Sequence, residues 1–145
     1  MYETDHSIAE PPQGPRKAWF RAVRETCGIT PAGLAKAVDV SLGEVLAWES
    51  PAGPEPAHDA CQWLAGALAD HWEQVDGIVD DAVEKLKPGE PAVLEYVCTQ
   101  AQFERLYPHL KASGIPCGYH TATLRAAFER LRYLGIPVVW RYPEG

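Results

Sequence analysis

The sequence predicts a mainly α protein: an N-terminal helix-turn-helix bundle, then a long helix, then a small C-terminal β-α-α-β module. Up to residue 50, apolar residues recur at helical spacing and capping residues stand at the expected helix ends. Residues 57–86 contain no proline and keep a heptad pattern of apolar residues. After residue 91, two runs rich in β-branched and aromatic residues enclose two helical patterns.

These patterns divide the chain into three parts. Residues 1–14 are polar and contain prolines and a glycine, so we expect a disordered tail. Residues 15–86 are expected to form the helix-turn-helix domain with its long connecting helix. Residues 92–145 are expected to form a small α/β module for dimerisation or effector binding, and the Pro- and Gly-containing segment 87–91 is the predicted boundary.

The first helix is predicted from residue 15 to about residue 27, where Gly28 ends it as a C-cap. Its inner face is apolar and consists of Trp19, Phe20, Val23 and Cys27. Arg21 and Arg24 are predicted on its outer side, either as a solvated surface or as contacts to DNA phosphates.

Residues 28–50 predict two short helices joined by a tight turn. Thr30 is an N-cap that precedes a proline, and Asp39 lies in the turn, where Asp tolerates a left-handed backbone. Ser41 and Glu44 form a capping box that opens the second helix. This helix is expected to bury Val45, Leu46 and Trp48.

The helix-turn-helix pattern is carried by Gly28, Thr30, Leu34–Ala35, Val40–Ser41, Val45 and Trp48–Glu49. In these positions the chain resembles the phage-repressor/Cro-like superfamily over about residues 15–70. The resemblance implies that the Ser41–Glu49 helix enters the major groove of DNA. A less specific resemblance, to the short YdiL-type bacterial helix-turn-helix proteins, extends over the whole chain through Phe103, Tyr107–Pro108, Leu124, Ala127 and Leu131.

The long helix is predicted from a heptad seam of Cys61, Ala65, Leu68, Trp72, Val75, Val79, Ala82 and Leu86. Gly77 lies near its middle, so a pair of shorter helices is the alternative. The second half is expected to pack on the C-terminal module or on a second copy of itself. We predict a homodimer, because two half-sites about 34 Å apart require two recognition helices. The interface is expected either on this helix, through Trp72, Val75, Val79 and Leu86, or at the edge of the strand predicted over residues 92–98.

In the C-terminal module, strands are predicted over residues 92–98 and 136–142. One helix begins after Thr99, which forms a capping box with Gln102, and a second begins at residue 120 or 121. Two strands alone make a poor sheet, so a partner chain or a helix is expected to complete its edge. The basic side chains of Arg125, Arg130, Arg132 and Arg141 are expected to meet the acidic long helix.

The predicted DNA interface comprises Lys17, Arg21, Arg24, Thr30, Lys36, Ser41, Leu42, Gly43, Glu44 and Ala47. Its basic residues would hold phosphates, Leu42 and Ala47 would touch thymine methyl groups, and Glu44 would accept a hydrogen bond from cytosine. The outward positions of this helix offer no Arg, Lys, Asn or Gln, the side chains that usually read bases. A purely structural capping role is the alternative for Glu44.

The net charge of −7 argues against a protein that coats nucleic acid, although the acid is concentrated in residues 57–95. Basic residues within 16–36 would form a local positive face. No apolar run approaches the length of a membrane span, and the N-terminal residues do not resemble a signal peptide. We therefore expect a cytoplasmic protein with reduced cysteines and no membrane partner.

Two His/Cys pairs, His58–Cys61 and Cys117–His120, have ligand-like spacing. They belong to different predicted domains, and Cys61 lies on the apolar seam, so no metal is predicted. No cofactor and no catalytic residue is predicted either, because the chain lacks a Gly-rich phosphate loop and the common nucleophile motifs.

The expected function is that of a homodimeric, DNA-binding transcriptional regulator of the Cro-like class, with double-stranded DNA as its partner. The alternative is a helix-turn-helix fold that binds another protein, as an antitoxin, anti-repressor or adaptor does. The acidic charge and the lack of base-reading side chains favour this alternative, whereas the complete motif favours the regulator.

Overall fold

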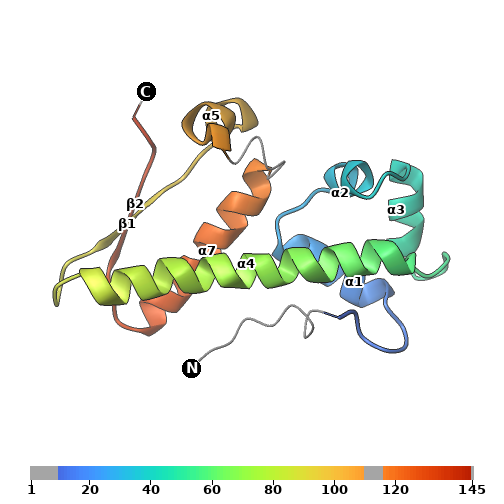
Figure 1. The fold of residues 1–145 in the computed structure, drawn as a ribbon, viewed down its shortest axis with the longest axis horizontal. Coiled ribbons are helices and arrows are strands. Elements are labelled where there is room, and N and C mark those ends of the chain that lie inside the picture. Colours follow the sequence, from blue (N-terminus) through green and yellow to red (C-terminus); the bar gives the residue numbers. More distant parts are fainter. Residues whose placement is uncertain (1–9, 110–115, 145) are drawn as a thin grey trace. The chain divides into compact units, whose positions relative to one another are not determined.

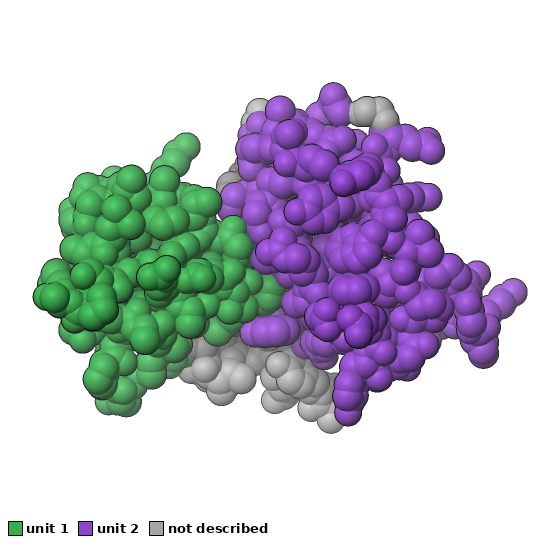
Figure 2. Space-filling view, turned by 180° about the vertical axis from the view of Figure 1, so that it is seen from behind, with its two compact units in different colours: residues 1–71 green, residues 72–145 purple. Residues whose placement is uncertain are grey.

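The structure is a computed structural model that describes residues 10–109 and 116–144 (Figure 1). The mainly α class with a small C-terminal β module is confirmed. Most of the predicted tail lies outside the described residues. The chain forms two compact units, residues 1–71 and 72–145 (Figure 2). The division falls inside the long helix, whereas the sequence suggested a boundary at residues 87–91.

The first unit contains α1 (Lys17–Thr26), α2 (Pro31–Ala37), α3 (Leu42–Glu49) and the first part of α4 (His58–Lys85). The helix ends follow the predicted capping. The hydroxyl oxygens of Thr30 and Ser41 accept hydrogen bonds from the backbone N–H groups of Gly33 and Glu44, at 3.0 and 3.1 Å. Asp39 adopts a φ of +57° in the turn between α2 and α3, as predicted.

The core of the first unit is built from Phe20, Leu34, Val45, Trp48 and Leu64. The rings of Phe20 and Trp48 meet edge to face with centroids 5.8 Å apart, which joins α1 to α3. Leu46 was expected on the inner side of α3, and this prediction is wrong, because 52% of the residue is exposed. Leu46 follows the buried Val45 and lies one helical step beyond the buried stripe.

The second unit contains the rest of α4 together with β1 (Ala92–Glu95), α5 (Gln100–Leu106), α7 (Cys117–Tyr133) and β2 (Val138–Arg141). The strands pair in parallel, with Val93 opposite Val139 and Glu95 opposite Arg141. Parallel pairing requires a long crossover, which the helical segment between the strands supplies. Both strands are shorter than expected, and α7 begins three residues before the earliest predicted start.

α4 is a single unbroken helix, so Gly77 does not divide it. Val75 and Val79 pack in the core of the second unit against Ala127 and Leu131 of α7, and Leu86 packs against the same cluster. The prediction that Val75, Val79 and Leu86 form a dimer interface is therefore wrong, because α7 covers the positions that a second copy would need. Trp72, the fourth predicted interface residue, is 39% exposed.

The expected attraction between the C-terminal arginines and the acidic long helix is confirmed at one position. Arg130 of α7 forms an ion pair with Asp76 of α4. Two other arginines pair elsewhere, Arg132 with Glu129 at 3.7 Å and Arg141 with Glu95 at 3.4 Å. The ion pair between Arg141 and Glu95 joins β2 to β1 on the outward face of the sheet.

Candidate nucleic-acid interface

The N-terminal turn of α3 is exposed to solvent. Ser41, Leu42, Gly43 and Glu44 are all exposed, and Ala47 is half-buried. The inward residues of the same helix, Val45 and Trp48, are buried. The helix thus has one face fixed in the core and an outer face that is available for contact, as a recognition helix requires.

Lys17 was predicted to contact phosphate, but it holds the end of α3 instead. Its Nζ donates hydrogen bonds to the carbonyl oxygens of Ala47 at 3.0 Å and Trp48 at 2.8 Å, and also to that of Pro54. The last carbonyl groups of a helix have no intrahelical partner and carry partial negative charge, so a lysine ammonium stabilises them. Lys17 is only half-exposed, and its donors are already used.

Arg24 was predicted on the outer side of α1, and this prediction is wrong. Its Nε and Nη2 donate to the two carboxylate oxygens of Glu49 at 2.6 and 2.8 Å, and its Nη1 donates to the carbonyl of Ile29 at 2.9 Å. The side chains of Arg24 and Glu49 are only 9% and 6% exposed. This bidentate pair joins α1 to the end of α3, so the Arg24 guanidinium is engaged within the first unit.

Three polar residues of the predicted interface remain on the surface around α3. Arg21 is exposed and pairs with Glu25 one turn later in α1, at 2.8 Å. Lys36 is exposed near the end of α2, and Thr30 is exposed at its start. Arg21 and Lys36 are therefore the predicted phosphate contacts whose charged groups reach solvent, and Lys36 has no described pairing partner.

The outer face of α3 is apolar as well as exposed. Leu42 and Leu46, one helical turn apart, are 46% and 52% exposed. Glu44, which is also exposed, accepts a hydrogen bond from the hydroxyl of Ser41 at 3.4 Å. The side of α3 that carries Leu42 and Leu46 therefore offers methyl groups rather than donor side chains.

The paired roles of Arg24 and Lys17 were missed in the sequence, although a signal for Arg24 was present. Arg24 stands four residues after Phe20 and three before Cys27, so it belongs to the same helical stripe as the core residues. Arginine side chains usually lie on the surface, and this general preference favours an outward position despite the helical stripe. Glu49 directly follows the buried Trp48 and supplies the compensating charge.

The second unit has a shallow hollow of about 480 Å³, lined by Tyr96, Arg125, Phe128, Glu129 and Trp140. The ring of Trp140 lies 5.5 Å from Phe128 and 6.2 Å from Tyr96, between centroids. These aromatic side chains come from the strand ends and from α7. The hollow therefore presents apolar rings beside two charged side chains, Arg125 and Glu129.

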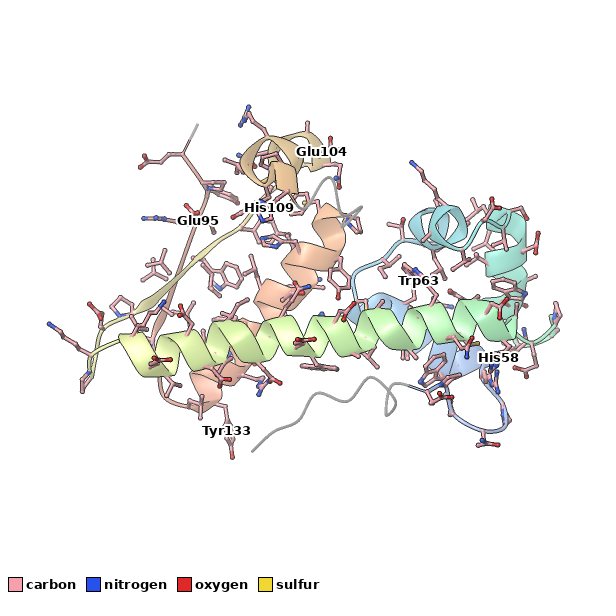
Figure 3. The ribbon with its side chains drawn as sticks, viewed as in Figure 1. His58, Trp63, Glu95, Glu104, His109 and Tyr133 are labelled. Atoms are coloured by element: carbon pink, nitrogen blue, oxygen red, sulfur yellow. The ribbon has the colours of Figure 1, made fainter. Side chains whose placement is uncertain are left out.

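The His/Cys pairs do not form a metal site in the described part of the chain, where no group of three or more His, Cys, Asp or Glu side chains is placed to hold an ion. His58, at the start of α4 (Figure 3), lies instead 3.2 Å from Arg16 through its Nδ1. Across residues 10–109 and 116–144, no helix is both long and apolar enough to span a membrane.

No protein-family model matches the chain, and no curated protein matches its sequence. The resemblance to the Cro-like superfamily and to the YdiL-type proteins therefore stays a prediction from the sequence.

Proposed function

We propose that this protein is a DNA-binding transcriptional regulator of the Cro-like helix-turn-helix class that acts as a homodimer in the cytoplasm. The observation that carries the proposal is the placement of α3. Its C-terminal end is held by Lys17 and by the Arg24–Glu49 pair, whereas its N-terminal turn is exposed. A recognition helix needs both a rigid anchor and free N-terminal residues.

In this mechanism the N-terminal turn of α3 enters the major groove. Leu42 contacts thymine methyl groups, as Ala47 does farther along the helix, and Glu44 accepts a hydrogen bond from a cytosine amino group. Arg21, Thr30 and Lys36 contact phosphates and set the register of the protein on the duplex. With few direct donors to bases, specificity depends on apolar contacts and on DNA shape.

Homodimerisation belongs to the same proposal, with the sheet of the second unit as the interface. Val93 and Val139 face each other across the two strands, and each is 47% exposed. A second copy that covered these valines would bury an apolar surface that α7 leaves open. It would also bring a second α3, as an inverted-repeat operator requires.

A helix-turn-helix that binds another protein is the second candidate function, and the exposed Leu42 and Leu46 favour it. Two leucines one turn apart on an exposed helix are typical of an apolar helix–groove contact. No Arg, Lys, Asn or Gln of α3 is present to compete with this role.

The deciding experiment is selection of bound duplexes from a random DNA library, at low and at near-physiological salt. Enrichment of an inverted repeat that survives the higher salt supports the regulator. Binding without enrichment that is lost with salt indicates phosphate contact alone. If no duplex binds at either salt, the regulator proposal is refuted and a protein partner becomes the function to test.

A matched pair of glycine substitutions tests the role of α3 itself. Gly43 and Gly77 are both exposed helical glycines, and a Cβ meets at most an ordinary contact at either position. Gly43→Glu places a negative charge where DNA phosphates would approach, and acid near a helix N-terminus does not harm the fold. We expect DNA affinity to fall at least about tenfold for Gly43→Glu and to remain within about twofold for Gly77→Glu.

A further inference from the structure

Cys98 and Cys117 lie close together in the second unit, although the sequence separates them. Cys98 is exposed and follows β1, whereas Cys117 is half-buried and is the first residue of α7. The Sγ atom of Cys117 lies 3.6 Å from the carbonyl oxygen of Val97. That oxygen belongs to the peptide bond between Val97 and Cys98, so the Cys117 thiol sits beside the backbone of Cys98.

Two glutamines of α5 fix this arrangement. The backbone N–H of Cys117 donates to Oε1 of Gln100 at 2.8 Å, and the N–H of Cys98 donates to Oε1 of Gln102 at 3.2 Å. Both cysteines are thereby held against the first turn of the same helix. Figure 3 labels Glu95 at the end of β1 and Glu104 in α5, which mark this region along the chain.

The two thiols also interact electrostatically. Burial raises the pKa of Cys117, and a negative charge on Cys98 raises it further. Cys117 is therefore a protonated thiol at neutral pH that has a second sulfur nearby. Cys98 is exposed, so an oxidant in solution can reach it first.

We propose that Cys98 and Cys117 form a peroxide-sensitive dithiol that closes to an intramolecular disulfide. In the first step the Cys98 thiolate attacks hydrogen peroxide, its sulfur is oxidised to a sulfenic acid, and hydroxide leaves. In the second step the Cys117 sulfur attacks the Cys98 sulfur, the S–O bond breaks, and the Cys117 proton leaves with the hydroxyl as water. The hydroxide released in the first step takes up the proton that the Cys98 thiol lost when it formed the thiolate, so the sum is two thiols and one peroxide converted to one disulfide and two waters.

The other two cysteines are expected to stay reduced when peroxide is added. Cys27 and Cys61 are buried in the first unit. Burial raises the pKa of Cys27 to about 12 and also raises that of Cys61. Cys27 and Cys61 are fully buried, so an oxidant in solution does not reach their sulfur atoms, and they serve as internal controls. The proposal does not depend on DNA binding.

The test treats the reduced full chain with hydrogen peroxide, alkylates the remaining thiols and maps the peptides by mass spectrometry. Of the four cysteines, Cys27 and Cys61 should stay thiols during the peroxide treatment and should then be alkylated. A peptide that joins Cys98 to Cys117 should appear, with a mass about 2 Da below the summed masses of the two reduced peptides. The same reaction in urea should lose this selectivity, because it depends on the folded arrangement.

Single serine variants separate the two roles. In Cys117→Ser, Cys98 should accumulate as a sulfenic acid that dimedone traps. In Cys98→Ser, peroxide should leave Cys117 as a thiol that can still be alkylated. Its rate of oxidation should be at least about tenfold below that of Cys98 in the parent protein. Circular dichroism confirms that each variant is folded. A product that joins Cys98 to Cys98 of another chain while Cys117 stays a thiol, or one that joins Cys27 to Cys61, would overturn the proposal.

Discussion

Arg24 and Glu49 show how a single charged residue in this protein serves the fold. Replacing Arg24 with Met leaves the carboxylate of Glu49 buried without its partner, which costs about 3–5 kcal/mol in comparable sites. We expect the free energy of unfolding of Arg24→Met, measured by urea denaturation, to fall by this amount. Arg21→Met is the matched control, because its partner Glu25 is exposed and the change should be much smaller. Equal losses in the two variants would contradict the role given to Arg24.

His120 should make the stability of the second unit depend on pH. Burial lowers its pKa below 6.5, and its ring packs against Phe103 and Tyr107 at 5.2 and 5.1 Å between centroids. The unfolded chain therefore takes up a proton near pH 6.5 that the folded chain refuses, so stability is full above this pH and falls as the pH drops below it.

The variant His120→Phe removes this titration and keeps an aromatic ring in the cluster. We expect its free energy of unfolding to fall less between pH 7 and pH 5 than that of the parent, as measured by urea denaturation at each pH. His58→Gln, at an exposed position in the first unit, is the control. A parent-like pH slope in His120→Phe would refute this assignment.

At the residue scale, the sequence predicted the caps well and the charges poorly. Thr30, Ser41 and Asp39 act through their nearest neighbours in the chain, so local rules are sufficient for them. Lys17 and Arg24 act through residues of α3 that are distant in sequence. No local pattern indicates which surface a long charged side chain will reach. For this reason only some of the predicted phosphate contacts, Arg21 and Lys36, are exposed to solvent.

At the scale of the elements, the turn after α3 depends on Gly53. A Cβ at this position would lie 2.1 Å from the carbonyl oxygen of Ala47, which is backbone and cannot move aside without distorting α3. Gly53→Ala should cost at least about 1–3 kcal/mol of stability, as overpacking does in other folded proteins.

Gly66 offers the opposite case within the same unit. It lies in the interior of α4, and a Cβ there meets nothing within 4 Å. Gly66→Ala should stabilise the protein by about 0.5–1 kcal/mol, because alanine loses less backbone entropy in a helix. Thermal unfolding of the two variants should therefore shift in opposite directions, and a shift in the same direction would contradict this account of Gly53.

Elements with strong periodicity were predicted closely, whereas short ones were not. α1 and α4 follow long helical patterns and were found near their predicted bounds. β1 ends at Glu95 although Tyr96 and Val97 continue the β-rich run, because the pairing with β2 ends opposite Arg141. Strand length is set by the partner strand, and the partner is unknown when one segment is read alone.

At the scale of the whole molecule, the core of the second unit and the proposed dimer interface can be separated by mutation. Val79→Ala removes buried contacts with α7, so it should lower stability by about 2 kcal/mol without changing the association of the protein. Val139→Glu charges the exposed sheet face and should convert a dimer to a monomer in sedimentation velocity.

Val83→Glu is the control for this experiment, because Val83 is also an exposed valine of the second unit but lies on α4 rather than on the sheet. It should leave the association state unchanged. If Val139→Glu remains dimeric, the sheet face is not the interface. If the parent protein is a monomer at all concentrations tested, homodimerisation as a whole is refuted.

The heptad seam shows why the arrangement of the whole chain was harder to predict than its class. The sequence left two partners open for residues 72–86, the C-terminal module or a second copy, since a seam of Val and Leu packs equally well on either. Only the folded unit shows that Ala127 and Leu131 occupy it. An apolar stripe therefore reports that burial occurs and does not identify what covers it.

Because β1 pairs with β2, which is the last strand of the chain, the second unit cannot complete its sheet until almost all of the chain has been synthesised. Val75 and Val79 leave the ribosome long before α7, which covers them, and β1 waits for β2 until nearly the whole unit has emerged. At 5–20 residues per second, the interval from residue 85 to residue 141 lasts roughly 3 to 11 seconds. The first unit ends at residue 71, so all of its residues are synthesised before that interval begins, and the nascent chain passes through a stage in which the apolar face of α4 lacks its partner α7.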